Sequence, residues 1–252
     1  MIKSFIKKML PLFIIEQHRK VKRERERVAN KNSSVEKVFT DIYLNNKWGG
    51  AKGEFKSGSG SVDQTIVSRY VTMIYDMADS EGFRGLNFVD LGCGDFNIGQ
   101  QLVALCAHYT GVDIVKPLVI RNQELFGNQH INFLHLNILD DDLPDGDVCF
   151  VRQVLQHLSN QQIGTLLAKL NKYKWVFITE HYPTDNDAIV PNKDKVHGGD
   201  IRIYDNSGVY LTLSPFQLSQ SALCMVLDVP GSAVASGDRG VIRTFLYKPA
   251  ST

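Results

Sequence analysis

A glycine-rich turn flanked by carboxylates lies in the stretch FVDLGCGDFNIG, residues 88 to 99. Asp90 ends an apolar run, and Gly92 and Gly94 let the backbone approach a ligand closely because neither has a Cβ atom. A dinucleotide fingerprint would continue with glycine where Asn97 stands, and Asp90 and Asp95 would repel a pyrophosphate. The turn therefore favours a ligand with cationic groups and hydroxyls over NAD.

Short apolar runs alternate with amphipathic stretches from Leu86 onwards, which is typical of an α/β fold with a mostly parallel sheet. No helical pattern lies between the last two runs, so we expect them to pair antiparallel as a hairpin. The predicted strands are near 86–90, 109–113, 131–136, 147–151, 174–180, 221–228 and 241–247. The predicted helices are near 33–46, 63–79, 97–106, 116–126 and 154–170.

The stretch VDLGCGDFNIG resembles motif I of the class I S-adenosylmethionine-dependent methyltransferases, with Phe96 where a third glycine is usual. The segment CGDFN is similar to a bacterial subgroup linked to glycan or cell-surface biosynthesis. That resemblance covers about residues 36–248 and is carried by IYLNNKWGG, FKSGSGS, YTGVDIV, LPDGDVCFVRQVLQHLS and GGDIR. It implies a Rossmann-like, seven-stranded methyltransferase sheet with N-terminal helices, and S-adenosyl-L-methionine as cofactor.

The resemblance implies cofactor contacts at the ends of the first four strands. Asp113 would accept hydrogen bonds from both ribose hydroxyls, and its alternative role is a helix cap. Asn137 would read the adenine amino group between Ile114 and Ile138, unless it is an ordinary turn residue. The expected cofactor-binding residues are Asp90, Gly92, Cys93, Gly94, Asp95, Asn97, Asp113, Ile114, Asn137, Ile138, Arg152 and Gln153.

Methyl transfer to a hydroxyl oxygen benefits from a general base, and histidine has a suitable pKa. His157 is one candidate, although the histidine of similar LxHL segments often packs near the cofactor in a structural role. Glu180 and His181, at the end of the fifth strand, are the other candidates. The sequence does not rank these three residues.

Two loops are expected to contact the acceptor. The glycine- and serine-rich loop 46–61 predicts a lid over the ligands, with a plain linker as the alternative. The long segment 178–202 supplies further polar groups. The expected substrate-binding residues are Trp48, Ser57, Ser59, Asp200 and Arg202. No metal is expected, because His181, His197, Asp200 and the acidic run 140–142 lack ligand spacing.

Residues 1–31 form a basic, amphipathic arm. They hold ten Lys and Arg side chains against three glutamates, a charge of +7, which leaves −6 for the rest of a chain whose total is +1. The apolar runs are too short for a membrane span, and no cleavage site follows them. The arm favours contact with an anionic membrane surface; a partner-binding helix and a solvated arm are the alternatives. We divide the chain into the arm (1–31), a helical cap with the lid loop (32–80) and a cofactor-binding domain (81–252).

Three hypotheses about function follow. The first is an S-adenosylmethionine-dependent methyltransferase that O-methylates a sugar, glycan or related small molecule. The second is a protein or nucleic-acid methyltransferase, although the charge of −6 on the body argues against a nucleic-acid partner. The third is a non-catalytic cofactor-binding module. The four cysteines form no CxxC pair, so we expect reduced thiols in a cytoplasmic protein, peripheral at the inner membrane face through its arm.

Overall fold

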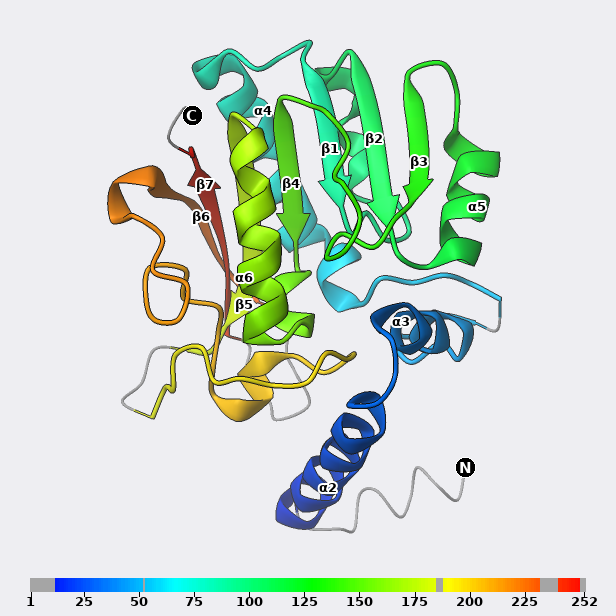
Figure 1. Cartoon of the computed structure of the whole chain (residues 1–252), viewed down its shortest axis with the longest axis vertical. Coiled ribbons are helices and arrows are strands. Elements are labelled where there is room, and N and C mark those ends of the chain that lie inside the picture. The colour runs from blue at the N-terminus through cyan, green and yellow to red at the C-terminus, as the bar shows by residue number, and fades with distance from the viewer. Residues whose placement is uncertain (1–11, 52, 185–187, 232–239, 250–252) are drawn as a thin grey trace.

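A single seven-stranded sheet organises the computed structural model, which describes residues 12–51, 53–184, 188–231 and 240–249 (Figure 1). The strand order is β3-β2-β1-β4-β5-β7-β6. The predicted number of strands and the fold class are confirmed. The strands are β1 (Asn87–Leu91), β2 (His108–Asp113), β3 (Ile131–His135), β4 (Val148–Arg152), β5 (Trp175–Tyr182), β6 (Leu223–Pro230) and β7 (Val241–Tyr247).

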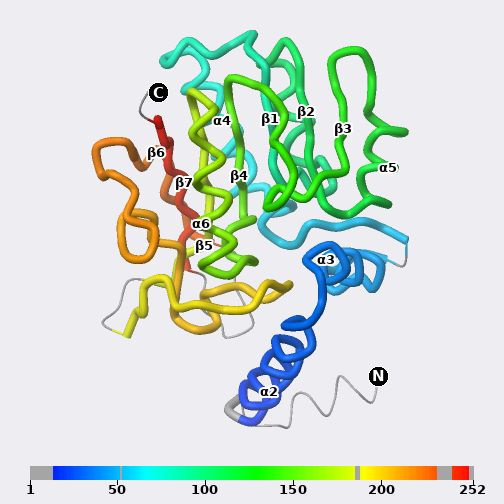
Figure 2. Tube along the Cα trace, in the orientation of Figure 1, coloured from blue at the N-terminus to red at the C-terminus, as the bar shows by residue number. Residues whose placement is uncertain are grey.

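The first five strands pair in parallel, so their carboxyl ends meet at one edge of the sheet. Asp90 of β1 stands opposite Gly111 of β2 and Phe150 of β4. The last two strands reverse direction, because β7 pairs antiparallel with both β5 and β6. The antiparallel pairing predicted for the last two strands is therefore confirmed. Figure 2 shows both strands, in red and orange, on the side of the sheet away from β3.

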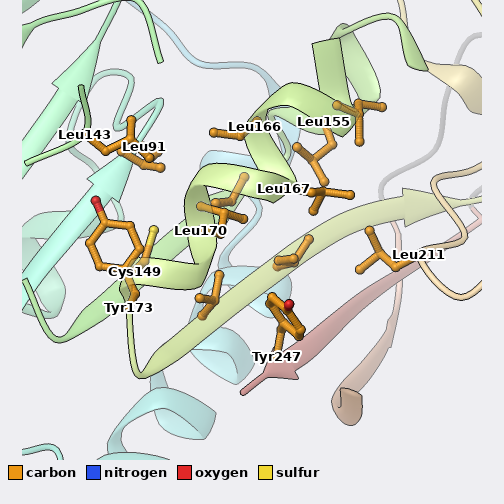
Figure 3. Close-up of a cluster of buried hydrophobic side chains, with 14 of the residues drawn as sticks. Leu91, Leu143, Cys149, Leu155, Leu166, Leu167, Leu170, Tyr173, Leu211 and Tyr247 are labelled. Atoms are coloured by element: carbon orange, nitrogen blue, oxygen red, sulfur yellow. The ribbon is translucent and has the colours of Figure 1, made fainter. Parts of the chain in front are cut away.

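Helices cover both faces of the sheet because alternate strand residues point to opposite faces. Helix α6 (Asn160–Lys169) packs against one face, and its cluster includes Leu91, Cys149, Leu166 and Leu170 (Figure 3). Helix α4 (Gln64–Glu81) covers the other face. Helix α5 (Lys116–Phe126) connects β2 to β3. Short 3-10 turns lie at 59–61, 99–101, 103–105, 155–157, 170–172, 202–205 and 220–222.

The predicted helix over residues 97–106 is wrong. Only the 3-10 turns Gly99–Gln101 and Val103–Leu105 form there. Phe96, directly before this segment, has a φ of +66°, which lies outside the α-helical region. Its buried ring packs edge-on against Phe133. A Cβ atom on Gly99 would come within 2.1 Å of the Tyr109 hydroxyl. The segment therefore follows the aromatic packing beneath it rather than a helical path.

The predicted helix 154–170 is interrupted in a similar way. Its first turn is the 3-10 turn Leu155–His157, and Ser159 then begins α6 with a capping box that it shares with Gln162. The interruption separates His157, at the edge of the sheet, from the helix that packs on its face.

The first two helices of the described chain lie beyond the carboxyl edge of the sheet (Figure 1). Helix α3 (Val35–Leu44) lies close to the ends of the strands, and α2 (Leu12–Asn30) projects from it away from the sheet. Residues 1–11 of the predicted basic, amphipathic arm (1–31) lie outside the described residues. Within the described part of the chain, no helix combines the length and hydropathy that a membrane span requires.

Replacing Phe177 by alanine should test the packing of the α4 face. Its ring is fully buried between Phe83 and Phe150, with centroid distances of 5.6 Å to each. We expect the free energy of unfolding to fall by about 3–5 kcal/mol, measured by urea denaturation. Leu125→Ala on the exposed side of α5 is the matched control and should change it by less than about 0.5 kcal/mol. Equal losses in both variants would contradict this account of the core.

Candidate functional site

A cavity of about 390 Å³ opens at the carboxyl ends of the parallel strands, between the sheet, α3 and the loops that follow β4 and β5. Open α/β sheets bind ligands at this edge. The structure brings most of the predicted site residues into the lining of this one cavity. They are Trp48, Ser57, Ser59, Asp90, Gly92, Cys93, Gly94, Asp95, Asp113, Ile114, Asn137, Ile138, Arg152, Gln153, His157 and His181.

The turn after β1 forms the floor of the cavity. The Asp90 carboxylate accepts a hydrogen bond of 2.5 Å from the Tyr109 hydroxyl, and burial raises the pKa of Asp90 to about 6. Gly94 has a φ of +56°, and a Cβ atom there would lie 2.3 Å from the Ser57 hydroxyl oxygen. A side chain at position 94 would therefore displace the lid loop as well as strain the backbone.

Asp113 ends β2 with its carboxylate in the cavity wall. Its two oxygens accept the backbone N–H groups of Gly94, at 3.1 Å, and Val115, at 3.0 Å. Burial raises the pKa of Asp113 above its usual range, and these hydrogen bonds oppose that effect. Val115, not Asp113, is the cap residue of α5. Each carboxylate oxygen keeps a further lone pair, so the geometry is compatible with two more hydrogen bonds.

Asn137 lines the cavity, but its side chain also shapes the local turn. Its amide nitrogen donates to Asp140 at 2.6 Å, and its amide oxygen accepts from the backbone of Leu139 at 3.1 Å. The turn role that the sequence left open is therefore present in the structure.

The lid loop, residues 46–61, lies along the cavity and is bonded to its floor. Ser57 and Asp95 exchange hydrogen bonds, of 3.0 Å from the Ser57 N–H to the carboxylate and 2.8 Å from the Asp95 N–H to the hydroxyl. The Tyr43 hydroxyl of α3 also contacts the Ser57 hydroxyl at 2.9 Å. Asn97 does not line the cavity; its side chain donates to the backbone oxygen of Ser61 and so fastens the lid. Figure 2 shows the lid, in light blue, crossing between α3 and the strand ends.

Arg152, at the end of β4, is the only Lys or Arg among the described residues that line the cavity. One terminal nitrogen donates to the Gly60 carbonyl at 2.8 Å, and the guanidinium lies 5.1 Å from the centre of the Tyr70 ring. Its Nε is buried and has no hydrogen-bond partner within the described structure. A buried donor of this kind is costly unless a ligand accepts from it.

His157 and Gln156 present polar atoms from the turn after β4. The His157 Nδ1 lies 3.0 Å from the Gly198 carbonyl, which only accepts, so Nδ1 carries the proton and Nε2 keeps a lone pair. Burial, together with the charge of Lys195, lowers the pKa of His157 to about 4. Gln156 lines the same cavity, and its side-chain oxygen is buried without a partner in the described structure.

Glu180 does not line the cavity, which corrects its placement beside the methyl donor. Its oxygens accept the backbone N–H groups of Leu155, at 2.7 Å, and Gln156, at 3.1 Å. Burial raises its pKa to about 8. Because alternate residues of β5 face opposite sides, His181 points to the cavity instead. Glu180 therefore positions the turn that carries Gln156 and His157.

Asp200 and Arg202 also lie outside the lining, so their placement in the substrate site is corrected. The Asp200 carboxylate pairs with Lys195 at 2.8 Å and with Arg27 at 2.6 Å. Arg202 donates to the backbone oxygens of Lys193, at 2.6 Å, and Leu158, at 2.8 Å. Both residues hold the segment 192–205, which we call the acceptor wall because its residues Gly199, Ile201 and Tyr204 line the cavity.

The sequence reasoning missed several lining residues, among them Gln156 and Tyr204. Val35, Phe39 and Tyr43 were missed as well, although their four-residue spacing in a predicted helix places them on one face. Nothing in the sequence pointed to Tyr204, which reaches the cavity through the irregular acceptor wall. In the described part of the chain, no group of three metal-ligating side chains gathers.

Comparisons with known proteins agree with this architecture. Residues 89–172, a third of the chain, match the model of a methyltransferase domain family. An uncharacterized methyltransferase of Mycobacterium bovis is 32% identical over 84 residues, and one of Mycobacterium tuberculosis strain H37Rv matches equally. These alignments cover 32% of this chain and 42% of each relative, so the match spans less than half the length of either relative.

Solved structures share the fold over a longer span. The N-methyltransferase NodS of Bradyrhizobium japonicum superposes with a TM-score of 0.51 and 18% identity, over 75% of this chain and all of that chain. The [4+2]-cyclase SpnF superposes with a TM-score of 0.55 and 12% identity, over 86% and 98% of the two chains. At these identities the likeness shows the fold alone. Residues 89–172 thus match a methyltransferase domain family, within a chain that shares the Rossmann-like fold of the N-methyltransferase NodS.

Proposed function

We propose that the protein transfers the methyl group of S-adenosylmethionine to a hydroxyl oxygen of a small, neutral, hydroxylated molecule such as a sugar. The observation that carries this proposal is the single cavity shared by the glycine turn, Asp113 and a group of neutral aromatic and histidine side chains. A cofactor and an acceptor bound there would lie in direct contact. We propose that the reaction takes place in the cytoplasm.

The polar groups of the cavity fit the proposed cofactor. Asp113 offers acceptors for ribose hydroxyls, and Asp90 and Asp95 place negative charge beside the turn, which suits a ligand with an amine and a sulfonium. The unpartnered Nε of Arg152 suits a carboxylate. S-adenosylmethionine carries all of these groups and, when bound, supplies a methyl group that is already activated.

The protein itself has two tasks in such a reaction, which are to align the acceptor and to take up its proton. The neutral His157 lines the cavity, and the lone pair on its Nε2 faces the Gln156 amide nitrogen at 3.5 Å, so Gln156 would have to yield this contact when the imidazole accepts a proton. Although its low pKa makes it a weak base, the acceptor oxygen becomes strongly acidic as it gains the methyl group, so a weak base suffices. His181 lines the same cavity and is the second candidate for this role.

The surroundings of His157 support a neutral acceptor. The rings of Trp48 and Phe39 lie 5.1 and 6.1 Å from the imidazole, and Ile201 and Tyr204 extend this apolar lining. Aromatic faces stack on the C–H faces of sugar rings, while His157 and Gln156 offer hydrogen-bond acceptors to hydroxyls. A nucleic-acid strand would instead need several cations along its path. Among the described residues that line the cavity, Arg152 is the only Lys or Arg.

Replacing Asp113 by asparagine should weaken cofactor binding. The change removes a charge and leaves one acceptor oxygen where there were two, so we expect the affinity for S-adenosylmethionine and S-adenosylhomocysteine to fall by ~100-fold. Isothermal titration calorimetry measures the loss, with circular dichroism as the check on folding. Asp76→Asn, at an exposed site on α4, should bind like the unchanged protein. Full affinity in Asp113→Asn would contradict the proposed cofactor site.

The buried His157 should remain neutral well below its ordinary pKa. Since an unfolded chain binds the proton near pH 6.5 and the folded one only near pH 4, folding stability should fall as the pH drops through this window. We expect the loss between pH 7 and 4.5 to be smaller in His157→Asn by on the order of 2 kcal/mol, from urea unfolding at both pH values. Nuclear magnetic resonance titration, with the variant assigning the signal, follows the ring directly. Protonation of His157 near pH 6.5 would refute this.

A further inference from the structure

Helix α2 has two faces with different surroundings. Its inner face is bonded to the acceptor wall, residues 192–205. Arg27 donates to Asp200 at 2.6 and 2.9 Å and to Asp205 at 2.5 Å. The side chain of Asn30 donates to the His197 carbonyl at 3.1 Å, and the Arg23 guanidinium lies 4.7 Å from the centre of the Tyr204 ring. These contacts fix which side of α2 faces the body of the protein.

The outer face of α2 carries an exposed apolar stripe. Ile14, Val21 and Val28 are 46%, 49% and 72% exposed. Their spacing of seven residues, at 100° per residue, places them in one line along the helix. The same geometry puts Arg23 roughly opposite the stripe and Arg27 about 100° from Val28, so the contacts of the inner face hold the stripe away from the acceptor wall. Figure 1 shows α2 projecting from the body of the protein.

Charge distinguishes the partners that such a stripe could take. Helix α2 contains six Lys or Arg residues and three glutamates, and the exposed Arg25 and Glu24 lie on either side of the stripe. A second copy of α2 would need a second apolar residue in each heptad, but the intervening positions hold Gln17, His18, Glu24 and Arg25. Apolar residues on a helix with three more cations than glutamates suit the boundary between the headgroups and acyl chains of an anionic lipid layer.

We propose that the outer face of α2 docks on an anionic lipid surface. The docked helix holds the acceptor wall on its other side, so the cavity stays beside the lipid. Acceptors would then be met at the membrane rather than in bulk solution. The docking goes beyond the proposed methyl transfer and does not depend on it.

Vesicle binding by the full chain tests the proposal. We expect sedimentation with vesicles of phosphatidylcholine containing 30% phosphatidylglycerol, little with phosphatidylcholine alone, and weakening as salt rises. The double variant Val21→Glu/Val28→Glu should bind at least ~10-fold more weakly. The matched control is Ile120→Glu/Leu125→Glu, which places the same charges on exposed aliphatic positions of α5 and should bind as before. Calorimetry with S-adenosylhomocysteine on all three proteins tests the proposed function separately.

Several outcomes would overturn the proposal. Full binding by the α2 double variant would place any lipid contact outside this stripe, and equal binding to neutral vesicles would remove the role of charge. Failure of the unchanged protein to bind either kind of vesicle would refute docking on lipid altogether. Light scattering tests whether a second copy of the chain occupies the stripe. Self-association that the α2 double variant abolishes would assign the stripe to that second copy and overturn the proposal.

Discussion

The backbone of Gly94 is the point on which the site depends. Its N–H donates to Asp113 at the end of β2, and its carbonyl accepts a hydrogen bond of 2.7 Å from the buried Asn122 of α5. The absence of a side chain leaves room for Ser57 of the lid loop. One residue therefore joins the turn after β1, the end of β2, helix α5 and the lid. No residue with a Cβ atom satisfies all of these contacts at a φ of +56°.

Polar groups buried around this point divide into two kinds. Glu180 and Asp200 have their partners within the protein and hold the turn after β4 and the acceptor wall in place. Arg152 and Gln156 each leave an atom unpartnered in the described structure, and both line the cavity. Arg202 and Asn160 also leave one buried atom each without a partner in the described structure, but neither residue lines the cavity. An unpartnered polar atom therefore suggests a ligand contact only where its residue also lines the cavity, as Arg152 and Gln156 do.

Much of the fold was readable from the sequence, because alternation of apolar runs and helical patterns reports burial directly. The seven strands and the antiparallel end of the sheet were predicted correctly. The helix predicted at 97–106 was wrong. The left-handed backbone of Phe96 and the packing of its ring depend on Tyr109 of β2 and Phe133 of β3, and the helical pattern of the segment does not report these contacts. Most site residues predicted on the glycine turn and at strand ends line the cavity, because parallel strands bring their ends together, whereas Asn97 bonds to Ser61 instead. Glu180, Asp200 and Arg202 were misplaced, because strand register and loop ion pairs decide which way a side chain points. The role of each lining residue stays a prediction, as does the division of the chain into arm, cap and domain.

The two coverings of the cavity are fastened by different chemistry. The lid loop is held by hydrogen bonds, which join Ser57 to the Tyr43 hydroxyl and to the backbone and carboxylate of Asp95, and the Gly60 carbonyl to the Arg152 guanidinium. The acceptor wall is held by the ion pairs of Asp200 and Asp205 with Arg27. The acceptor-wall ion pairs are largely buried, with 14% of the Arg27 side chain and 10% of the Asp200 side chain exposed, so salt should screen them less than it screens surface pairs. Because α2 supplies Arg27, an element that precedes the sheet by more than fifty residues fixes one side of the cavity, and the loop after α3 covers another.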